Sequence, residues 1–218
     1  MNIKRLNKIL TSDVSVVILD IDGTLKDLCR EHEIALRHTL TRFNIKPSIK
    51  KIILNVNKIA MSIVKIGIIP TNSMNQRVLT ILFALLAGVK IQKFREEYFN
   101  NYTEQLYLFD GVCELLERLK KEKTVYFATI NNQNYNLEKC GIPQDKIIYT
   151  KGILKVKTYM KLCKSISVNK KQVVIVGDNL FDDILSAKLL KVRYLLVNNY
   201  NSKFKKLICR LINRKQLE

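Results

Sequence analysis

Apolar positions divide the chain into a helical stretch and a stretch in which strands alternate with helices. Residues 16–19 form an apolar run that is too short for a helix and rich in β-branched residues, so they predict a buried strand. From Lys26 to about Leu108 the apolar residues recur at helical spacing, and no run alternates as a strand would. We expect four helical regions there: 28–43, 49–69, 75–89 and 91–108. The last region carries an aromatic row that we assign to the core: Phe94, Tyr98, Phe99 and Tyr102.

The pattern changes after Asp110. Short apolar runs at 125–128, 173–176 and 194–197 predict strands, and 146–149 is a further short apolar piece. Between them we expect helices at 112–121, 134–140, 159–167 and 181–190. Strands that alternate with helices predict right-handed crossovers and a parallel sheet. In such α/β sheets, functional residues lie at the carboxyl ends of the strands.

Polar residues follow three of the predicted strands. Asp20 and Asp22 follow the first, Thr129 follows the second with Asn131 and Asn132 close behind, and Asp178 follows the third with Asp182 and Asp183. A loop with Lys151, Lys155 and Lys157 lies between the second and third strands. Two carboxylates at the end of a buried strand are costly unless a cation lies between them, and a divalent ion with oxygen ligands is suited to that position. The alternative for Asp22 and Gly23 is an ordinary Asp-Gly turn.

Composition indicates a globular, reduced protein. The chain has 218 residues, 47% of them hydrophobic, and its five cysteines are scattered without metal-site spacing. Basic residues interrupt residues 1–10, and the apolar run 78–89 is too short to span a bilayer. We therefore expect a cytoplasmic protein.

The net charge is +19, and the lysines are spread over nearly every segment. Abundant Lys, Ile and Asn together are typical of an AT-rich genome, so solvated faces explain the charge better than a surface for polyanions. We expect no specific nucleic-acid partner.

Two motifs resemble those of the haloacid dehalogenase (HAD) superfamily, most closely its phosphatases. The run VVILDIDGTL at 16–25 is similar to the first motif, and VVIVGDNLFDDILSAK at 173–188 is similar to the fourth. The resemblance implies an α/β fold, a Rossmannoid core with a parallel sheet flanked by helices. It also implies an all-helical cap inserted after the first strand. Residues 1–25 and 109–218 would form the discontinuous core, and residues 26–108 the cap.

The resemblance also implies a magnesium-dependent site. Mg²⁺ would be held by Asp20, Asp178 and a backbone carbonyl at Asp22. Asp20 would be the nucleophile that forms an aspartyl-phosphate, and Asp22 the general acid and base. Thr129 and Lys155 would bind the phosphoryl oxygens, and Asp183 would orient the lysine and the metal.

The sequence departs from the family at two of these positions. Thr129 is followed by Ile130 before Asn131, and Lys155 is followed by Val156 where the family has proline. Lys157 and Lys151 are therefore alternatives to Lys155. Asp182 stands where a neutral residue is usual, and its role is not assigned.

An acid at position 22 favours phosphomonoester hydrolysis, because dehalogenases of the family lack it. The predicted activity is hydrolysis of a small phosphorylated metabolite. The alternatives are a sugar phosphomutase, which shares every core residue, and a catalytically idle HAD-like protein that binds a polyanion or a membrane surface. The sequence does not indicate an oligomeric state.

The C-terminal tail predicts a basic amphipathic helix over 203–217. Its apolar stripe comprises Phe204, Leu207, Ile208, Leu211 and Ile212, and it has no acid before Glu218. We expect this terminal helix to dock on the core. The alternative is a surface helix that contacts anionic lipid or another protein.

Overall fold

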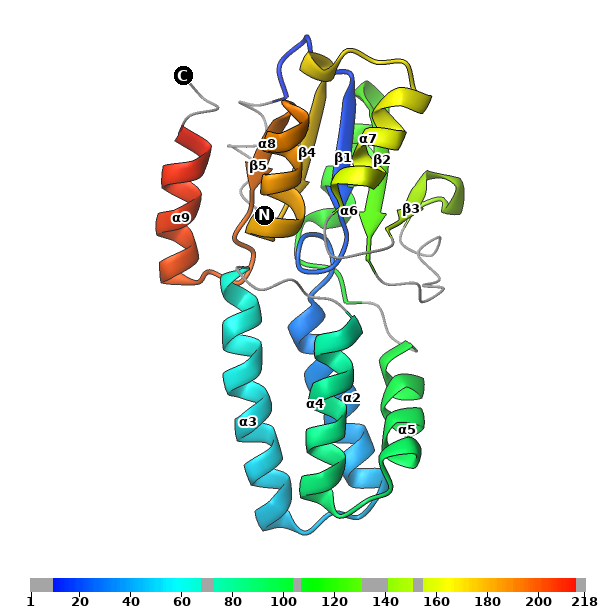
Figure 1. Ribbon diagram of the computed structural model, residues 1–218, viewed down its shortest axis with the longest axis vertical. Coiled ribbons are helices and arrows are strands. Elements are labelled where there is room, and N and C mark those ends of the chain that lie inside the picture. The colour runs from blue at the N-terminus through cyan, green and yellow to red at the C-terminus, as the bar shows by residue number, and fades with distance from the viewer. Residues whose placement is uncertain (1–9, 68–72, 104–106, 131–140, 151–154, 215–218) are drawn as a thin grey trace.

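The computed structural model describes residues 10–67, 73–103, 107–130, 141–150 and 155–214. Figure 1 shows a sheet with its flanking helices in the upper half and a group of helices below the carboxyl ends of the strands. The expected helix at 134–140, together with Asn131, Asn132 and Lys151, lies outside the described residues.

The sheet has five parallel strands in the order β3-β2-β1-β4-β5. The strands are β1 Val16–Asp20, β2 Thr124–Thr129, β3 Ile147–Tyr149, β4 Val173–Gly177 and β5 Arg193–Leu196. β1 is central, and all five of its residues are buried. Both faces of a parallel sheet are covered, which explains why this strand is a continuous apolar run in the sequence. The structure confirms the predicted fold class.

Helices cover both faces of the sheet and enclose a core on each. Helix α6 (Val112–Glu122) packs on one face through Leu115, Leu116 and Leu119. The other face is covered by α7 (Val156–Ser165), α8 (Ser186–Leu190) and α9 (Lys203–Arg214). A wide π-type turn, Leu180–Leu185, precedes α8, and short 3₁₀ turns lie at Gln144–Lys146 and Lys170–Gln172.

Four helices between β1 and α6 form what we call the helical unit. They are α2 (Leu28–Arg42), α3 (Pro47–Ile66), α4 (Ser73–Ala87) and α5 (Ile91–Thr103), and they share a core of their own. Phe94, Tyr98 and Tyr102 are buried in it, as the aromatic row predicts. Helix α5 ends before the expected boundary at Leu108, because Leu108 pairs with Lys26 as extended chain where the unit rejoins the sheet.

The C-terminal helix α9 docks on the core as expected, although not through its whole apolar stripe. Phe204, Leu207 and Leu211 are exposed, and only Ile208 and Ile212 of the apolar stripe are partly buried. The buried positions are instead Lys205, Cys209 and Asn213, spaced four residues apart on one helix face. The Asn213 side chain bonds both the amide (3.0 Å) and the carbonyl (2.9 Å) of Leu196 in β5, which fixes this polar face against the sheet.

Among the described residues, no helix is long and apolar enough to cross a membrane.

Candidate active site

Three carboxylates meet at the carboxyl ends of β1 and β4. Asp20 ends β1, Asp178 follows β4, and Asp183 comes from the π-type turn. Each places an oxygen within 4.8 Å of the others, and all three side chains are buried. They meet because β1 and β4 are adjacent parallel strands whose carboxyl ends share one edge of the sheet.

Lys155 joins two of these carboxylates. Its ammonium contacts the Asp20 carboxylate directly and donates a hydrogen bond of 2.8 Å to Asp183. The Tyr159 hydroxyl also donates to Asp183, at 3.0 Å. Lys157, the alternative from the sequence, is exposed on α7, and Lys151 lies outside the described residues. Among the described lysines of this loop, the geometry therefore favours Lys155.

The second carboxylate of the first motif has a different set of partners. The Thr129 hydroxyl donates to Asp22 at 2.9 Å, and the Lys26 ammonium lies 3.2 Å from its other oxygen. Lys26 also pairs with Glu31 at 2.7 Å, and all of these groups are buried. Asp20 in turn accepts a hydrogen bond of 2.7 Å from the Thr24 hydroxyl. The structure thus brings Asp20, Asp22, Thr129, Lys155, Asp178 and Asp183 to one edge of the sheet. Asp22 is not one of the three carboxylates whose oxygens lie within 4.8 Å of one another.

Sequence reasoning missed Lys205. Its ammonium lies 2.9 Å from Asp178 Oδ2, and its side chain is fully buried although it comes from the C-terminal helix. Its spacing to Cys209 and Asn213 was a usable signal, because the three residues define a second face of α9 beside the apolar stripe. Lys26 and Glu31 were missed for a simpler reason: no local pattern distinguishes them from exposed charged residues.

Burial governs the electrostatics of the site. Loss of hydration raises the pKa of Asp20, although the Lys155 charge opposes the rise, and it raises the pKa of Asp178 against the opposing charge of Lys205. Burial also raises the pKa of Asp182 to about 7. The pKa of Lys155 is raised despite its burial, because Asp183 and Asp20 surround it.

The cluster fits a divalent metal ion. Its donors are all carboxylate oxygens, which are the ligands that Mg²⁺ prefers. The raised pKa values of Asp20 and Asp178 show that the two lysines do not fully offset the cost of burying these charges. A further cation at this position would stabilise the carboxylates in their ionised form.

The space left at the site is small. A pocket of about 10 Å³ is lined by residues of the cluster and of the adjoining turn, among them Asp20, Asp22, Lys155 and Asp178. That volume is roughly one water molecule.

Comparisons with known proteins agree with the motifs. The family model for haloacid dehalogenase-like hydrolases matches residues 17–197, and the chain belongs to this family. A comparison with curated proteins found no match.

Several solved structures share the fold. The HAD-hydrolase YfnB of Bacillus subtilis, solved with magnesium bound, is 17% identical with a TM-score of 0.67, covering 88% of this chain and 91% of its own. A predicted phosphoglycolate phosphatase of Haemophilus somnus is 16% identical with a TM-score of 0.61, covering 90% and 92%. A 2-haloacid dehalogenase of Pseudomonas syringae pv. Tomato is 22% identical with a TM-score of 0.51, covering 87% and 88%. These structures show the fold, and the names of the proteins they describe imply different activities.

Proposed function

We propose that the protein is a Mg²⁺-dependent phosphatase that hydrolyses small phosphomonoesters through an aspartyl-phosphate. The observation that carries this proposal is the pair of carboxylates Asp20 and Asp22. Asp20 contacts the Lys155 ammonium and the Thr24 hydroxyl at the end of β1. Asp22 accepts a hydrogen bond from the Thr129 hydroxyl beside it. A phosphatase of this kind needs one carboxylate to attack phosphorus and another to handle the proton of the leaving alcohol.

In the proposed reaction, an Asp20 oxygen forms a bond to phosphorus while the ester P–O bond breaks. Asp22 donates a proton to the leaving alcohol. Water then attacks the phosphorus of the aspartyl-phosphate, Asp22 takes up its proton, and phosphate leaves while Asp20 is restored.

The other polar residues of the site place positive charge and hydrogen-bond donors near the phosphoryl group or would hold the metal ion. The Lys155 ammonium and the Thr129 hydroxyl are placed to contact phosphoryl oxygens and offset their negative charge. Asp183 holds Lys155, and Asp20, Asp178 and Asp183 are the side chains that would hold the metal, with the Asp22 backbone carbonyl as the further ligand that the family resemblance implies. When bound, Mg²⁺ would supply positive charge that lets a carboxylate approach a phosphate anion.

The helical unit lies below the carboxyl ends of the strands, so its movement away from the sheet would open the carboxylate cluster to substrate. We therefore propose that this unit acts as the cap. The structure of YfnB was described as revealing interdomain movement, which supports motion of this kind in a protein of the same fold.

Asp22 also favours this reaction over dehalogenation, since a halide leaves without needing a proton. A sugar phosphomutase shares the same residues, and product analysis separates the two activities. A phosphatase releases inorganic phosphate, whereas a mutase returns an isomeric sugar phosphate.

The test is hydrolysis of a generic aryl phosphate with Mg²⁺ and with EDTA. We expect metal-dependent release of phosphate that is abolished in Asp20→Asn and lowered by at least ~100-fold in Asp22→Asn. Asp145→Asn removes an exposed carboxylate outside the site and serves as the matched control. Equal turnover in Asp20→Asn and wild type would contradict the proposal.

A further inference from the structure

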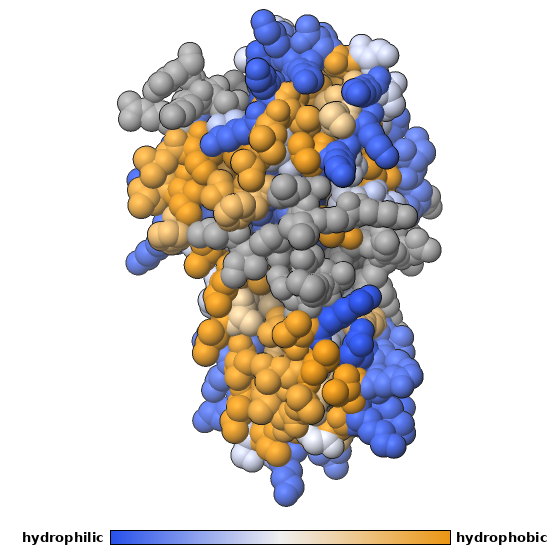
Figure 2. All heavy atoms as spheres, viewed as in Figure 1, coloured by the Kyte–Doolittle hydropathy of each residue, from blue (hydrophilic) through white to orange (hydrophobic). Residues whose placement is uncertain are grey.

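The helical unit exposes a broad apolar surface. Helices α3 and α4 pack against each other and carry large aliphatic side chains that face solvent: Ile52, Ile59, Ile63, Val78, Leu82, Leu85 and Leu86. Ile59, Leu85 and Val78 are 66%, 64% and 60% exposed. Figure 2 shows a continuous hydrophobic area over these helices. Contiguous apolar patches of this kind mark interaction sites in proteins that are otherwise well folded.

A second apolar area lies over α8 and α9, on the same side of the molecule (Figure 2). It includes Phe204, Leu207 and Leu211 of α9, together with Phe181, Leu185 and Leu189 of the preceding turn and α8. Both groups recur at helical spacing of three to four residues, so each forms a stripe along its helix. We call the two areas together the apolar face.

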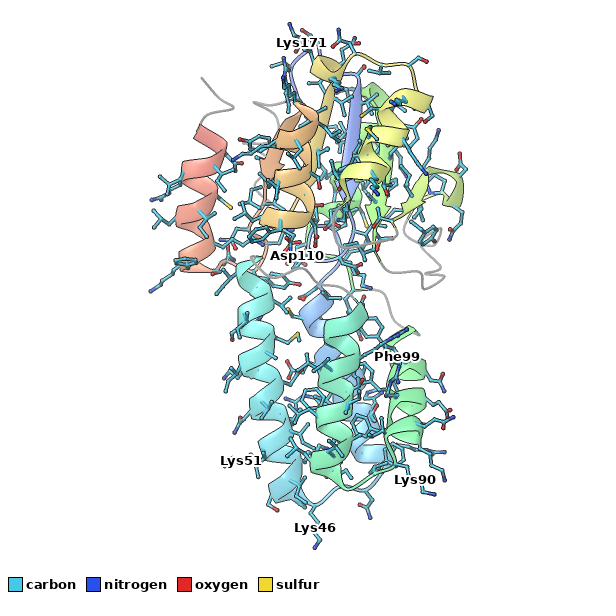
Figure 3. All side chains as sticks on the ribbon, viewed as in Figure 1. Lys46, Lys51, Lys90, Phe99, Asp110 and Lys171 are labelled. Carbon is cyan, nitrogen blue, oxygen red and sulfur yellow. The ribbon has the colours of Figure 1, made fainter. Side chains whose placement is uncertain are left out.

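Apart from the buried Asp182 and Asp183 of the turn that carries Phe181, the segments that form this face contain basic residues and no acids. Residues 34–95 contain 11 Lys and Arg and no Asp or Glu, and residues 184–217 contain nine and none. Acids are found instead on α2, with Glu31 and Glu33, and on α5, with Glu96 and Glu97. Lys46, Lys51 and Lys90 extend from the far end of the helical unit, as Figure 3 shows. Apolar side chains among cations, with no acids, complement a surface that is apolar beneath a layer of negative charge.

We propose that the apolar face docks on a membrane containing anionic lipids, with α3, α4 and α9 lying in the interface. Basic helices with an apolar stripe bind such surfaces by burying the stripe among the acyl chains while Lys and Arg contact the headgroups. Docking of a second copy is disfavoured, because each chain carries a net charge of +19. Nucleic acid offers the negative charge but no apolar layer for Ile59 or Leu85. The inference is independent of the phosphatase chemistry.

The chain contains no tryptophan, so one introduced residue reports its own surroundings. Leu85→Trp on α4 and Leu211→Trp on α9 sample the two areas, and Ile91→Trp on α5 is the control. With vesicles of phosphatidylcholine and phosphatidylglycerol in equal parts, we expect a blue shift of the fluorescence in Leu85→Trp and Leu211→Trp. We expect none in Ile91→Trp, and none in any variant with pure phosphatidylcholine.

Co-sedimentation with the same vesicles measures affinity. Ile59→Ser combined with Leu85→Ser should weaken binding by about tenfold or more, whereas Ile91→Ser should bind as wild type does. Unfolding curves establish that each variant is folded. The proposal is overturned if the protein does not bind anionic vesicles, if it binds while the tryptophan at position 85 stays in water, or if the double variant binds unchanged. It is also overturned if the free protein is a dimer and these substitutions make it monomeric. The apolar face would then be an interface between two copies of the protein.

Discussion

At the scale of single residues, the site depends on which charges are buried together. Lys155 illustrates this point, because Lys151 and Lys157 lie near it in the sequence and only its contacts with Asp20 and Asp183 distinguish it from the described Lys157. Its ammonium compensates two buried carboxylates, and in the proposed reaction it would contact the phosphoryl group.

We expect Lys155→Met to lower kcat for an aryl phosphate by at least ~100-fold, because the variant loses the cation that offsets charge on the transferring group. Lys157→Met, two residues away on the exposed side of α7, should keep near wild-type turnover. Steady-state kinetics with saturating Mg²⁺ measures both. If Lys157→Met were the inactive variant, the assignment of the phosphate-binding lysine would be wrong.

Glu31 gives a prediction for the pH dependence of stability. Burial raises its pKa from 4.5 to about 7, although the Lys26 charge and the Tyr107 amide oppose the rise. Because the folded state holds this proton more tightly than the unfolded state does, the free energy of unfolding should fall as pH rises from about 4.5 to 7. The contribution is at most about 3 kcal/mol.

The Glu31→Gln variant has no such proton to lose. Its free energy of unfolding, measured by urea titration across this pH range, should fall less steeply than that of wild type. The slope is the relevant quantity, since removing one partner of Lys26 shifts the overall stability as well. Identical slopes would show that the pKa of Glu31 is the same in the folded and the unfolded state.

At the scale of elements, the end of α3 connects the helical unit to the loop after β4. Gly67 ends the helix with a φ of 70°, and its carbonyl accepts a hydrogen bond of 2.7 Å from the Leu180 amide. A Cβ at this position would lie 2.3 Å from the Asp178 carbonyl oxygen. The approach of α3 to the loop that carries Asp178 thus requires glycine.

Gly88 offers a matched comparison, because it ends α4 with a φ of 67° and has nothing within 4 Å of its added Cβ. Gly88→Ala should lower the free energy of unfolding by about 1 kcal/mol, because alanine is disfavoured in the left-handed conformation. Gly67→Ala should cost more and also lower phosphatase activity, because the clash is with backbone and separates α3 from the loop. Urea unfolding and aryl phosphate turnover measure the two effects. Equal losses in both variants would contradict this account of the contact.

At the scale of the whole molecule, Lys205 links the C-terminal helix to the site. Its ammonium pairs with Asp178. A Cβ added at Gly67 would lie 2.7 Å from Lys205 Nζ. Helix α9, the loop after β4 and the helical unit therefore meet at this lysine. This buried cation neutralises a carboxylate that we assign to the metal. Lysine and metal ion are both attracted to Asp178 and repel each other.

Lys205→Met should therefore have two opposite effects. The melting temperature in EDTA should fall, because Asp178 loses its partner. The concentration of Mg²⁺ needed for half-maximal activity should also fall, because a competing positive charge has been removed. Lys206→Met, on the exposed side of the same helix, should change neither quantity. A higher Mg²⁺ requirement in Lys205→Met would show that the lysine assists metal binding instead.

Much of this organisation could be predicted from the sequence. Short apolar runs indicated the strands, and parallel strands bring their carboxyl ends to one edge, so Asp20, Thr129 and Asp178 could be expected to lie together. The motif at 16–25 and the motif at 173–188 were sufficient to indicate the family. These features are local or follow from sheet topology, which is why the sequence alone determined them.

The tertiary structure decided the rest. The roles of Lys26, Lys155 and Lys205 depend on which carboxylate each lysine contacts in the folded protein. No spacing pattern along the chain predicts these contacts. The face by which α9 docks was also decided there. An apolar stripe can pack on a core or remain in solvent, whereas Lys205 and Asn213 had buried partners in Asp178 and Leu196. Leaving buried polar groups unpaired costs more than exposing a few leucines, so the polar face of the helix was the one that docked.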